Sequence, residues 1–367
     1  MPFQVSPGVN VSEVDLTAVV PSVSTTEGGI AGHFRWGPVE QRVLVTSEDQ
    51  LVSQFSKPTA DTYEGFFTAA NFLSYGNALY VVRANSTGLK NATSNAGNSA
   101  ITLIKNSDDY VNNYDAGISN VGEVVSKYPG ALGNSLKISK CPSAAAYKST
   151  LTGTYTITSN TASIAFSANQ ASALVAGDVI DVGLTTGSKQ SIRVATVDSG
   201  GLAATLSTTY TGTSITGNTA LTRNWEYASS TSRAPGTTQF ATNTGSTGDG
   251  LHIAIVDEDG LWTGIRGTVL EVFENVSKAS DAKDTTGRSN YYRDVLNSRS
   301  RYVWWAAHDS TLTNIGTASN GVTYGVPGIT SSTSLVNGSD GSAATAGEIN
   351  TALDKFSMSL TSKFYGS

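Results

Sequence analysis

The stretch FFTAANFLSYGNALYVVRA, residues 66–84, decides the fold of the first part of the chain. It begins inside a helix that we predict over about 62–75, because apolar residues recur at i, i+4 and i+7 and form one buried stripe. This stripe consists of Phe66, Ala70 and Leu73. Gly76 suits the end of the helix, since glycine tolerates a positive φ. The apolar run 78–83 then predicts a buried strand, so the stretch indicates a helix packed against a strand.

The residues before this stretch complete a small α/β unit. Apolar runs at 30–36 and 43–45 predict two more strands. A short helix is predicted after them, because Ser47 and Gln50 have the spacing of a capping box. We assign residues 23–86 to this unit.

A helix near the other end of the chain is assigned to the same unit. Thr345 and Glu348 form a second capping-box pair. Apolar residues follow at helical spacing, and they are Ile349, Leu353 and Phe356. We therefore group residues 330–367 with residues 23–86. A helix that ends an α/β unit usually leads into a strand, so we expect the unit to be incomplete in this chain.

Residues 1–22 predict an extended arm. Three prolines in this segment remove backbone donors and disfavour a helix. Apolar side chains alternate between the prolines at Val9, Val11, Val14 and Leu16. A frayed terminus is the common alternative, but the alternation favours a strand that pairs with another chain. These four residues are our candidate intersubunit contacts.

Residues 87–147 and 233–329 are assigned to one β-rich middle domain. Its clearest predicted strands are 251–256, 269–276 and 302–307, with further strands at 100–104, 135–139 and 261–264. The acidic run 257–260 ends in glycine and predicts the turn of a hairpin between 251–256 and 261–264. Trp304 and Trp305 are adjacent, so they should point to opposite faces of their strand, one into the core and one to an interface.

Residues 148–232 differ from both flanks. The segment carries almost no charge, and apolar residues alternate with Ser and Thr. Turn residues recur about every 8–12 positions, which is typical of a small sandwich or barrel. We predict an inserted β domain. The fold class is therefore α/β plus β, with several domains.

Composition excludes several classes of protein. The chain has 367 residues, 23 Lys and Arg, 29 Asp and Glu, and a net charge of −6, which argues against nucleic-acid binding. No apolar run approaches the length of a transmembrane helix, and the first residues do not have the pattern of a secretory signal. The single cysteine, Cys141, excludes an internal disulfide framework.

No catalytic motif stands out. The sequence lacks a Walker-type loop, a G-x-S-x-G elbow and an H-E-x-x-H pair. The three histidines, His33, His252 and His308, are far apart and are interpreted as partly buried residues. We therefore predict no enzyme activity, no cofactor and no metal site.

One segment is cationic in this acidic chain. Residues 278–301 hold six cationic and three acidic residues, a balance of +3. Arg288, Arg293, Arg299 and Arg301 are candidates for polar contacts between subunits. The alternative is a solvated segment whose ion pairs each contribute less than about 1 kcal/mol.

Eight blocks of the sequence, in this order, resemble the contractile tail sheath proteins of T-even-like bacteriophages (myoviruses). The blocks are SPGVNVSEVD at 6–15, FRWGP at 34–38, LVTSEDQLVSQFSKP at 44–58, FFTAANFLSYGNALYVVRA at 66–84, KYPGALGNSLKIS at 127–139, EVFENVSKASDAKD at 271–284, NYYRDVLNSRSRYVWW at 290–305 and LVNGSDG at 335–341. The resemblance does not include residues 148–227. It implies that a C-terminal α/β region and a second arm of the family are absent from this chain.

The resemblance implies a structural role. Sheath subunits form helical rings around an inner tail tube, linked by terminal arms, and contract to drive the tube through the host envelope for genome ejection. The implied partners are other sheath subunits, the tube protein, and baseplate and terminator proteins, without nucleic-acid or membrane binding. The implied location is the virion, after assembly in the host cytoplasm, and the inserted β domain would face outward. A tailocin or other contractile injection sheath, or a β-rich surface adhesin, are the alternatives.

Overall fold

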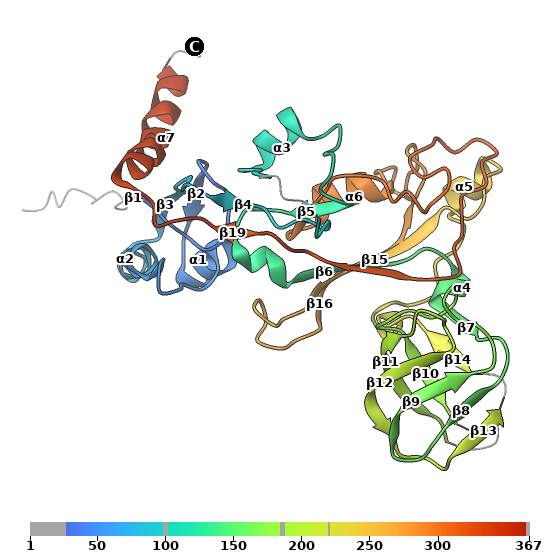
Figure 1. The fold of residues 1–367 in the computed structure, drawn as a ribbon. Helices are drawn as coiled ribbons and strands as arrows, with labels where there is room; N and C mark the ends of the chain where they lie inside the picture. Colours follow the sequence, from blue (N-terminus) through green and yellow to red (C-terminus); the bar gives the residue numbers. More distant parts are fainter. Residues whose placement is uncertain (1–26, 98–101, 184–187, 219–220, 365–367) are drawn as a thin grey trace, which may run out of the picture.

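The computed structural model describes residues 27–97, 102–183, 188–218 and 221–364, with side chains described up to residue 356 (Figure 1). The predicted arm, with Val9, Val11, Val14 and Leu16, lies outside the described residues. The described part is mixed α/β and rich in strands, as the composition and patterning predict. Its strands form a three-stranded sheet, a four-stranded sheet, an eight-stranded sheet and two small two-stranded sheets.

The N-terminal unit is built on a three-stranded sheet in the order β1-β3-β2. Its strands are β1 (Glu27–Gly32), β2 (Arg42–Val45) and β3 (Ala78–Arg83). β3 is parallel to β1 and antiparallel to β2. The helices of this unit are α1 (Glu48–Phe55), α2 (Tyr63–Leu73) and α7 (Ala346–Phe364). Apolar side chains of α1 and α2 form one core with the sheet, and α7 contributes Ala352 and Phe356 to a separate cluster with Val82.

Two glycines in β1 allow helices to pack closely on this sheet. A Cβ atom at Gly28 would lie 2.6 Å from the ring of Phe72 on α2. A Cβ atom at Gly29 would lie 3.3 Å from the ring of Phe356 on α7. Consecutive residues point to opposite faces of a strand, so α2 and α7 cover opposite faces of β1. Both predicted capping residues are confirmed: the Ser47 hydroxyl accepts from the Gln50 backbone N–H, and Glu348 accepts from the Thr345 N–H.

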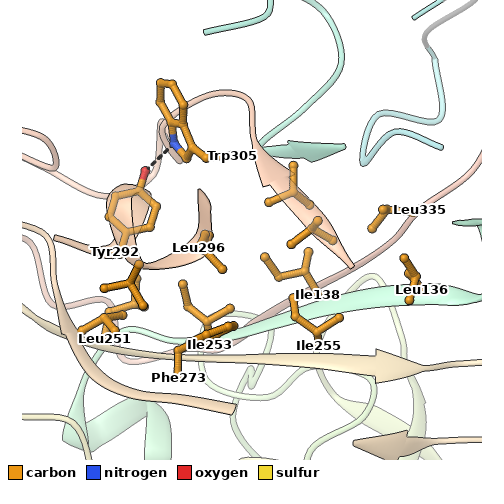
Figure 2. Packing of buried hydrophobic residues seen from close by; sticks show 14 of the residues in the cluster. Leu136, Ile138, Leu251, Ile253, Ile255, Phe273, Tyr292, Leu296, Trp305 and Leu335 are labelled. Carbon is orange, nitrogen blue, oxygen red and sulfur yellow. Dashed lines mark hydrogen bonds between the residues drawn. The ribbon is translucent and has the colours of Figure 1, made fainter. Parts of the chain in front are cut away.

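The middle of the molecule is a four-stranded antiparallel sheet in the order β16-β15-β6-β18. Its strands are β6 (Leu136–Cys141), β15 (Gly250–Asp257), β16 (Thr268–Ser277) and β18 (Ser331–Ser334). Helix α6 (Tyr292–Arg299) and strand β17 (Val303–Trp305), which pairs with β5 (Val124–Ser126), pack over it. Figure 2 shows this core, in which the Trp305 Nε1 donates to the Tyr292 hydroxyl at 3.0 Å.

The structure corrects three predictions in this region. Residues 261–264 form turns, so the hairpin connection is longer than predicted and β16 begins only at Thr268. Asp257 explains this, because its carboxylate accepts from the backbone N–H groups of Trp262 and Thr263 and holds the connection in a compact loop. Residues 102–105 are not a strand, and residues 100–101 lie outside the described part. Trp304 and Trp305 do enter different clusters, but both are buried within the chain rather than one lying at an interface.

Residues 148–224 form an eight-stranded antiparallel sheet in the order β13-β8-β9-β12-β11-β10-β14-β7. The strands are β7 (Lys148–Thr150), β8 (Tyr155–Ile157), β9 (Thr161–Phe166), β10 (Val179–Val182), β11 (Gln190–Val197), β12 (Ala203–Tyr210), β13 (Ile215–Asn218) and β14 (Thr222–Asn224). The sheet curls on itself (Figure 1). It encloses an apolar core whose residues come from the segment 151–221. The alternation of apolar and polar residues along these strands therefore places the apolar side chains in the core and the polar side chains on the exposed face.

The remaining elements are short and connect these sheets. They are β4 (Leu89–Lys90), α3 (Ser107–Asn113), the 3-10 helix Ala131–Ser135, α4 (Ala144–Tyr147), the 3-10 helix Ala228–Ser230, α5 (Gln239–Asn243) and β19 (Ser339–Asp340). The two strands β4 and β19 pair with each other. After β18 the chain runs back along the molecule to α7 and so returns to the N-terminal unit (Figure 1).

Candidate assembly surfaces

The outer sides of β1 and β2 are open. β3 lies between them, and no other described strand pairs with either edge. Edge strands present unpaired N–H and C=O groups that can pair with another chain. β1 is also the first described element after the predicted arm, residues 1–22. These edges are therefore the part of the described fold most suited to strand addition.

The sequence blocks around this unit meet at a buried arginine. Arg83, at the end of β3, is fully buried, and its Nη1 donates to the carbonyl oxygens of Gly37 at 3.0 Å and Pro129 at 2.8 Å. Burial lowers the pKa of the guanidinium to about 10, partly offset by the charge of Asp340. Arg83 thus joins the FRWGP block to the KYPGALGN block through backbone carbonyls.

A second set of contacts joins the same loop to the returning chain. The Asn134 side-chain amide donates to the Gly338 carbonyl at 3.0 Å and accepts from the Gly338 N–H at 2.7 Å. The Asp340 carboxylate accepts from the Ala131 N–H at 2.8 Å. Gly130 has a φ of 145°, and a Cβ there would lie 2.6 Å from the Arg35 carbonyl oxygen. Asn134 and Gly338 are 204 residues apart in the sequence, so these contacts join distant blocks into one hydrogen-bonded junction.

The predicted cationic segment does not form one surface. Lys278 is buried, and its Nζ donates to the carbonyl oxygens of Pro142, Gly248 and Gly325. Burial lowers the pKa of Lys278 to about 8. Arg293 pairs with the Asp115 carboxylate at 2.8 Å and lies over the Trp305 ring, 4.7 Å from its centre. Both residues therefore have partners inside the chain.

The other three candidate arginines are exposed. Arg288 lies in the exposed loop before α6, whereas Arg299 and Arg301 lie at the end of α6 and just after it. None of the three forms an ion pair within the described part of the chain. Arg299 and Arg301 line a groove of about 500 Å³, and Arg288 does not. The structure brings two of the four candidate arginines together.

This groove lies between the end of α1, the β15–β16 connection and the chain after α6. Aromatic residues line it, and they are Trp36, Tyr128, Trp262 and Tyr302. Their rings pack edge to face, with the Trp36 and Trp262 ring centres 4.9 Å apart and those of Trp262 and Tyr302 5.0 Å apart. Such packing fixes the aromatic side chains, so the groove is a preformed, partly apolar surface.

Lys127 is a buried cation in the groove lining. Its Nζ lies 3.2 Å from the centre of the Trp304 ring and donates to the Asn297 carbonyl oxygen at 3.1 Å. Burial lowers the pKa of Lys127 to about 7, and Glu271 opposes this shift. A second buried cation, Lys140 on β6, pairs with both Glu123 and Asp309. Asp309 is buried as well, and Glu123 is partly exposed.

The inserted sheet is joined to the middle sheet by buried polar and aromatic contacts. The Arg223 guanidinium on β14 donates to the carbonyl oxygens of Ala145, Ala146 and Gly328. Asp178 lies 3.7 Å from Arg223 Nε and accepts from the Thr330 hydroxyl at 3.0 Å. Burial raises the pKa of Asp178 to about 6. Just after β14, the buried Trp225 donates from Nε1 to the Ser139 hydroxyl on β6 at 3.0 Å.

The three histidines differ in exposure: His33 is partly buried as predicted, whereas His252 is fully buried and His308 is exposed. His33, His252 and His308 occupy separate places, and burial lowers the pKa of each. Cys141 is buried, and burial raises the pKa of its thiol to about 12. Among the described residues no group of three or more His, Cys, Asp and Glu could hold a metal ion. No described helix is long and apolar enough to cross a membrane.

One exposed surface was not predicted from the sequence. Tyr63 and Phe67 on α2 are 49% and 52% exposed, and Tyr75 just after the helix is 95% exposed. The spacing of Tyr63 and Phe67, i and i+4, was the available signal, since it places two aromatic rings on one helix face. Because Phe67 lies next to the buried stripe of the same helix, its exposure could not be recognised from the pattern of apolar residues.

Comparisons with known proteins show which class of protein this chain resembles. Three curated relatives are tail sheath proteins of bacteriophages: 42% identity over 106 residues with that of Enterobacteria phage T4, 28% over 322 residues with that of Salmonella phage ViI, and 40% over 89 residues with that of Vibrio phage KVP40. The matches cover 29%, 82% and 24% of this chain. They cover 16%, 49% and 13% of the relatives, so the chain spans about half of their length or less. No family model matches the sequence.

Two solved structures are also similar. They are the sheath tail proteins of Listeria innocua, with a TM-score of 0.35, 11% identity and coverage of 91% of this chain and 38% of that chain, and of Desulfitobacterium hafniense, with 0.32, 9%, 97% and 43%. The similarity to tail sheath proteins rests on the sequence matches. They place the chain among relatives that are structural components of phage virions. The predicted resemblance to tail sheath proteins of T4-like phages is thereby confirmed.

Proposed function

We propose that this chain is a structural subunit of a phage contractile tail sheath. Its subunits would assemble helically around the tail tube and contract to drive the tube through the host envelope, without enzymatic chemistry or a cofactor. The observation that carries the proposal is the 28% identity over 82% of the chain with a tail sheath protein. Because the match covers half of that relative, assembly and contraction remain properties proposed for the whole protein.

The N-terminal arm would link neighbouring subunits by strand addition. The alternation of Val9, Val11, Val14 and Leu16 supports an arm that forms main-chain hydrogen bonds in a sheet of another copy. The open edges of β1 and β2 supply sheet edges of the required kind. A head-to-tail contact of this type that does not close generates a helical assembly.

The division of the chain follows this role. We propose an arm (1–22), a sheath α/β domain (23–86 with 330–367), a β-rich middle domain (87–147 with 233–329) and an inserted domain (148–232) that faces outward. The self-contained core of the eight-stranded sheet supports the last assignment. The exposed Arg288, Arg299 and Arg301 are proposed intersubunit contacts, and Arg293 is a weaker candidate because Asp115 already pairs with it.

Other partners follow from the proposed role. The inner face of the assembly would contact the tail tube protein, and its two ends would contact baseplate and tail terminator proteins. Assembly would take place in the cytoplasm of the host bacterium. We propose no contact of this chain with nucleic acid or membrane.

Electron microscopy of purified particles tests the proposal. Antibodies against residues 151–221 should decorate tails along their length, and those tails should occur in a long and a short state. Decoration of capsid-free particles of the same kind would assign the chain to a tailocin. Labelling of a cell surface or of non-contractile fibres would contradict the proposed function and favour an adhesin.

A further inference from the structure

We infer that the exposed face of α2 docks into the aromatic, cationic groove of a second copy of this chain. The inference rests on the proposed function, because it names two surfaces through which sheath subunits would join. What we call the α2 face consists of Tyr63, Glu64 and Phe67 on the helix and Asp61 just before its N-cap. The groove is the one lined by Trp262, Tyr302, Arg299 and Arg301.

The groove has unused positive charge. Lys57, Arg299 and Arg301 are exposed on its rim, and none forms an ion pair within the described part of the chain. Lys127 also lines the groove, with Glu271 near it. These cations belong to a chain of net charge −6, so an acidic surface of another copy is a suitable partner.

The α2 face has the complementary chemistry. Asp61 and Glu64 are exposed and form no ion pair among the described residues. Tyr63 and Phe67, one turn apart on α2, are about half exposed. Aromatic rings are enriched where proteins associate, because each buries a large area at a small cost in conformational entropy. Two acids and two rings at the start of α2 therefore match three cations and the aromatic residues that line the groove.

The positions of the two surfaces fit a head-to-tail contact. In Figure 1, α2 lies at one end of the N-terminal unit, and the β15–β16 connection that borders the groove lies on the far side of α1. A copy that places its α2 face in a neighbour's groove keeps its own groove free for the next copy. Such a contact repeats along an assembly instead of ending in a closed pair.

A charge-exchange experiment tests the contact. One variant carries Arg299→Glu and Arg301→Glu in the groove, and the other carries Asp61→Lys and Glu64→Lys on the α2 face. Each variant alone should associate at least tenfold more weakly than wild type by sedimentation velocity at low salt. An equimolar mixture should recover association, because each altered surface then meets its opposite charge on the other variant. The variant Lys148→Glu/Lys189→Glu, on the insert, has the same charge change as the groove variant and should associate like wild type.

The outcomes separate the inference from the proposed function. If wild type assembles and either double variant alone assembles equally well, the contact is wrong while the sheath role stands. A mixture that stays as weak as its parts, with melting temperatures of all variants unchanged, overturns the pairing of these two surfaces. If the wild-type chain does not associate at any accessible concentration, both the proposed function and the contact are contradicted.

Discussion

The inserted sheet and the N-terminal unit differ in how far they cover their own apolar side chains and strand edges. The eight strands of the insert curl around a core of their own. Among the described residues of 148–224, Leu202, just before β12, is the only exposed large apolar residue. The N-terminal unit has three strands, and no other described strand pairs with either of its two edges. Large apolar side chains are exposed on it at Leu44, Tyr63, Phe67, Tyr75 and Leu353.

This difference indicates where the chain needs a partner. A sheet that buries its own apolar face gains nothing by association, whereas open edges and exposed rings leave hydrogen bonds and apolar area to be satisfied by another chain. The insert is therefore best suited to the periphery of an assembly, and the N-terminal unit to its connected part. Four predictions test or refine this contrast.

Removal of the N-terminal arm should have the largest effect on assembly. Deletion of residues 2–20 should leave a monomer with the melting temperature of wild type, because the deleted residues precede β1. Assembly into tubes should be lost, since the connecting strand is gone. Electron microscopy and light scattering give the readout, and tube formation at the wild-type level would contradict an intersubunit role for Val9, Val11, Val14 and Leu16.

Two different excisions of the insert should have different effects on stability. β7 and β14 are paired, with Thr150 opposite Thr222, so a short Gly/Ser turn can replace residues 151–221. The remainder should then melt cooperatively and close to the wild-type temperature. Excision of residues 148–232 also removes Arg223 and the buried Trp225, and loss of a buried tryptophan costs about 3–5 kcal/mol. Thermal melts of both proteins decide the matter, and equal stability would show that the anchor contributes little.

The buried lysine of the groove should make stability depend on pH. The pKa of Lys127 is lowered to about 7 in the folded chain, while the unfolded chain keeps the ordinary lysine value. Above pH 7 the unfolded state therefore binds the extra proton, and the free energy of unfolding should rise with pH by up to about 1.4 kcal/mol per unit. Lys127→Met should reduce this slope, whereas Lys189→Met on the exposed insert should not. Denaturant melts from pH 7 to pH 10 provide the measurement. If the free energy of unfolding rose equally steeply with pH in wild type and in Lys127→Met, the effect would be ruled out.

Arg288, in the loop before α6, and Arg293, on α6, should differ slightly in their effect on stability. Arg288→Glu should change the free energy of unfolding by less than about 0.5 kcal/mol, as is usual at exposed positions. Arg293→Glu loses an ion pair and a contact with Trp305, so it should cost about 1–2 kcal/mol.

In their effect on association the two variants should rank in the opposite order, with the larger change from Arg288→Glu. Arg288→Glu should weaken association at low salt and lose this effect at high salt, because the charge is exposed and screened. Association that is unchanged at low salt would make Arg288 part of a solvated loop.

Local pattern was sufficient where chemistry and spacing act within one element. The stripe of Phe66, Ala70 and Leu73 gave the helix, and the alternation after residue 148 gave a sheet with its own core. The convergence of Arg83, Pro129 and Gly338 could not be predicted, because it depends on contacts between segments far apart in the sequence. The burial of Lys278 was missed for the same reason: its three carbonyl partners come from three different loops. Charge counts along the sequence therefore overstated the cationic surface.

Hydrogen–deuterium exchange of the chain before and after assembly tests the contrast most directly. Amides of β1, β2 and α2 should become strongly protected in the assembled state, because a neighbouring copy then covers the open edges and the exposed aromatic face. Amides of β8 to β13 in the insert should exchange at the same rate in both states. Protection that appears in the insert, with the N-terminal unit unchanged, would contradict this account of how the chain associates.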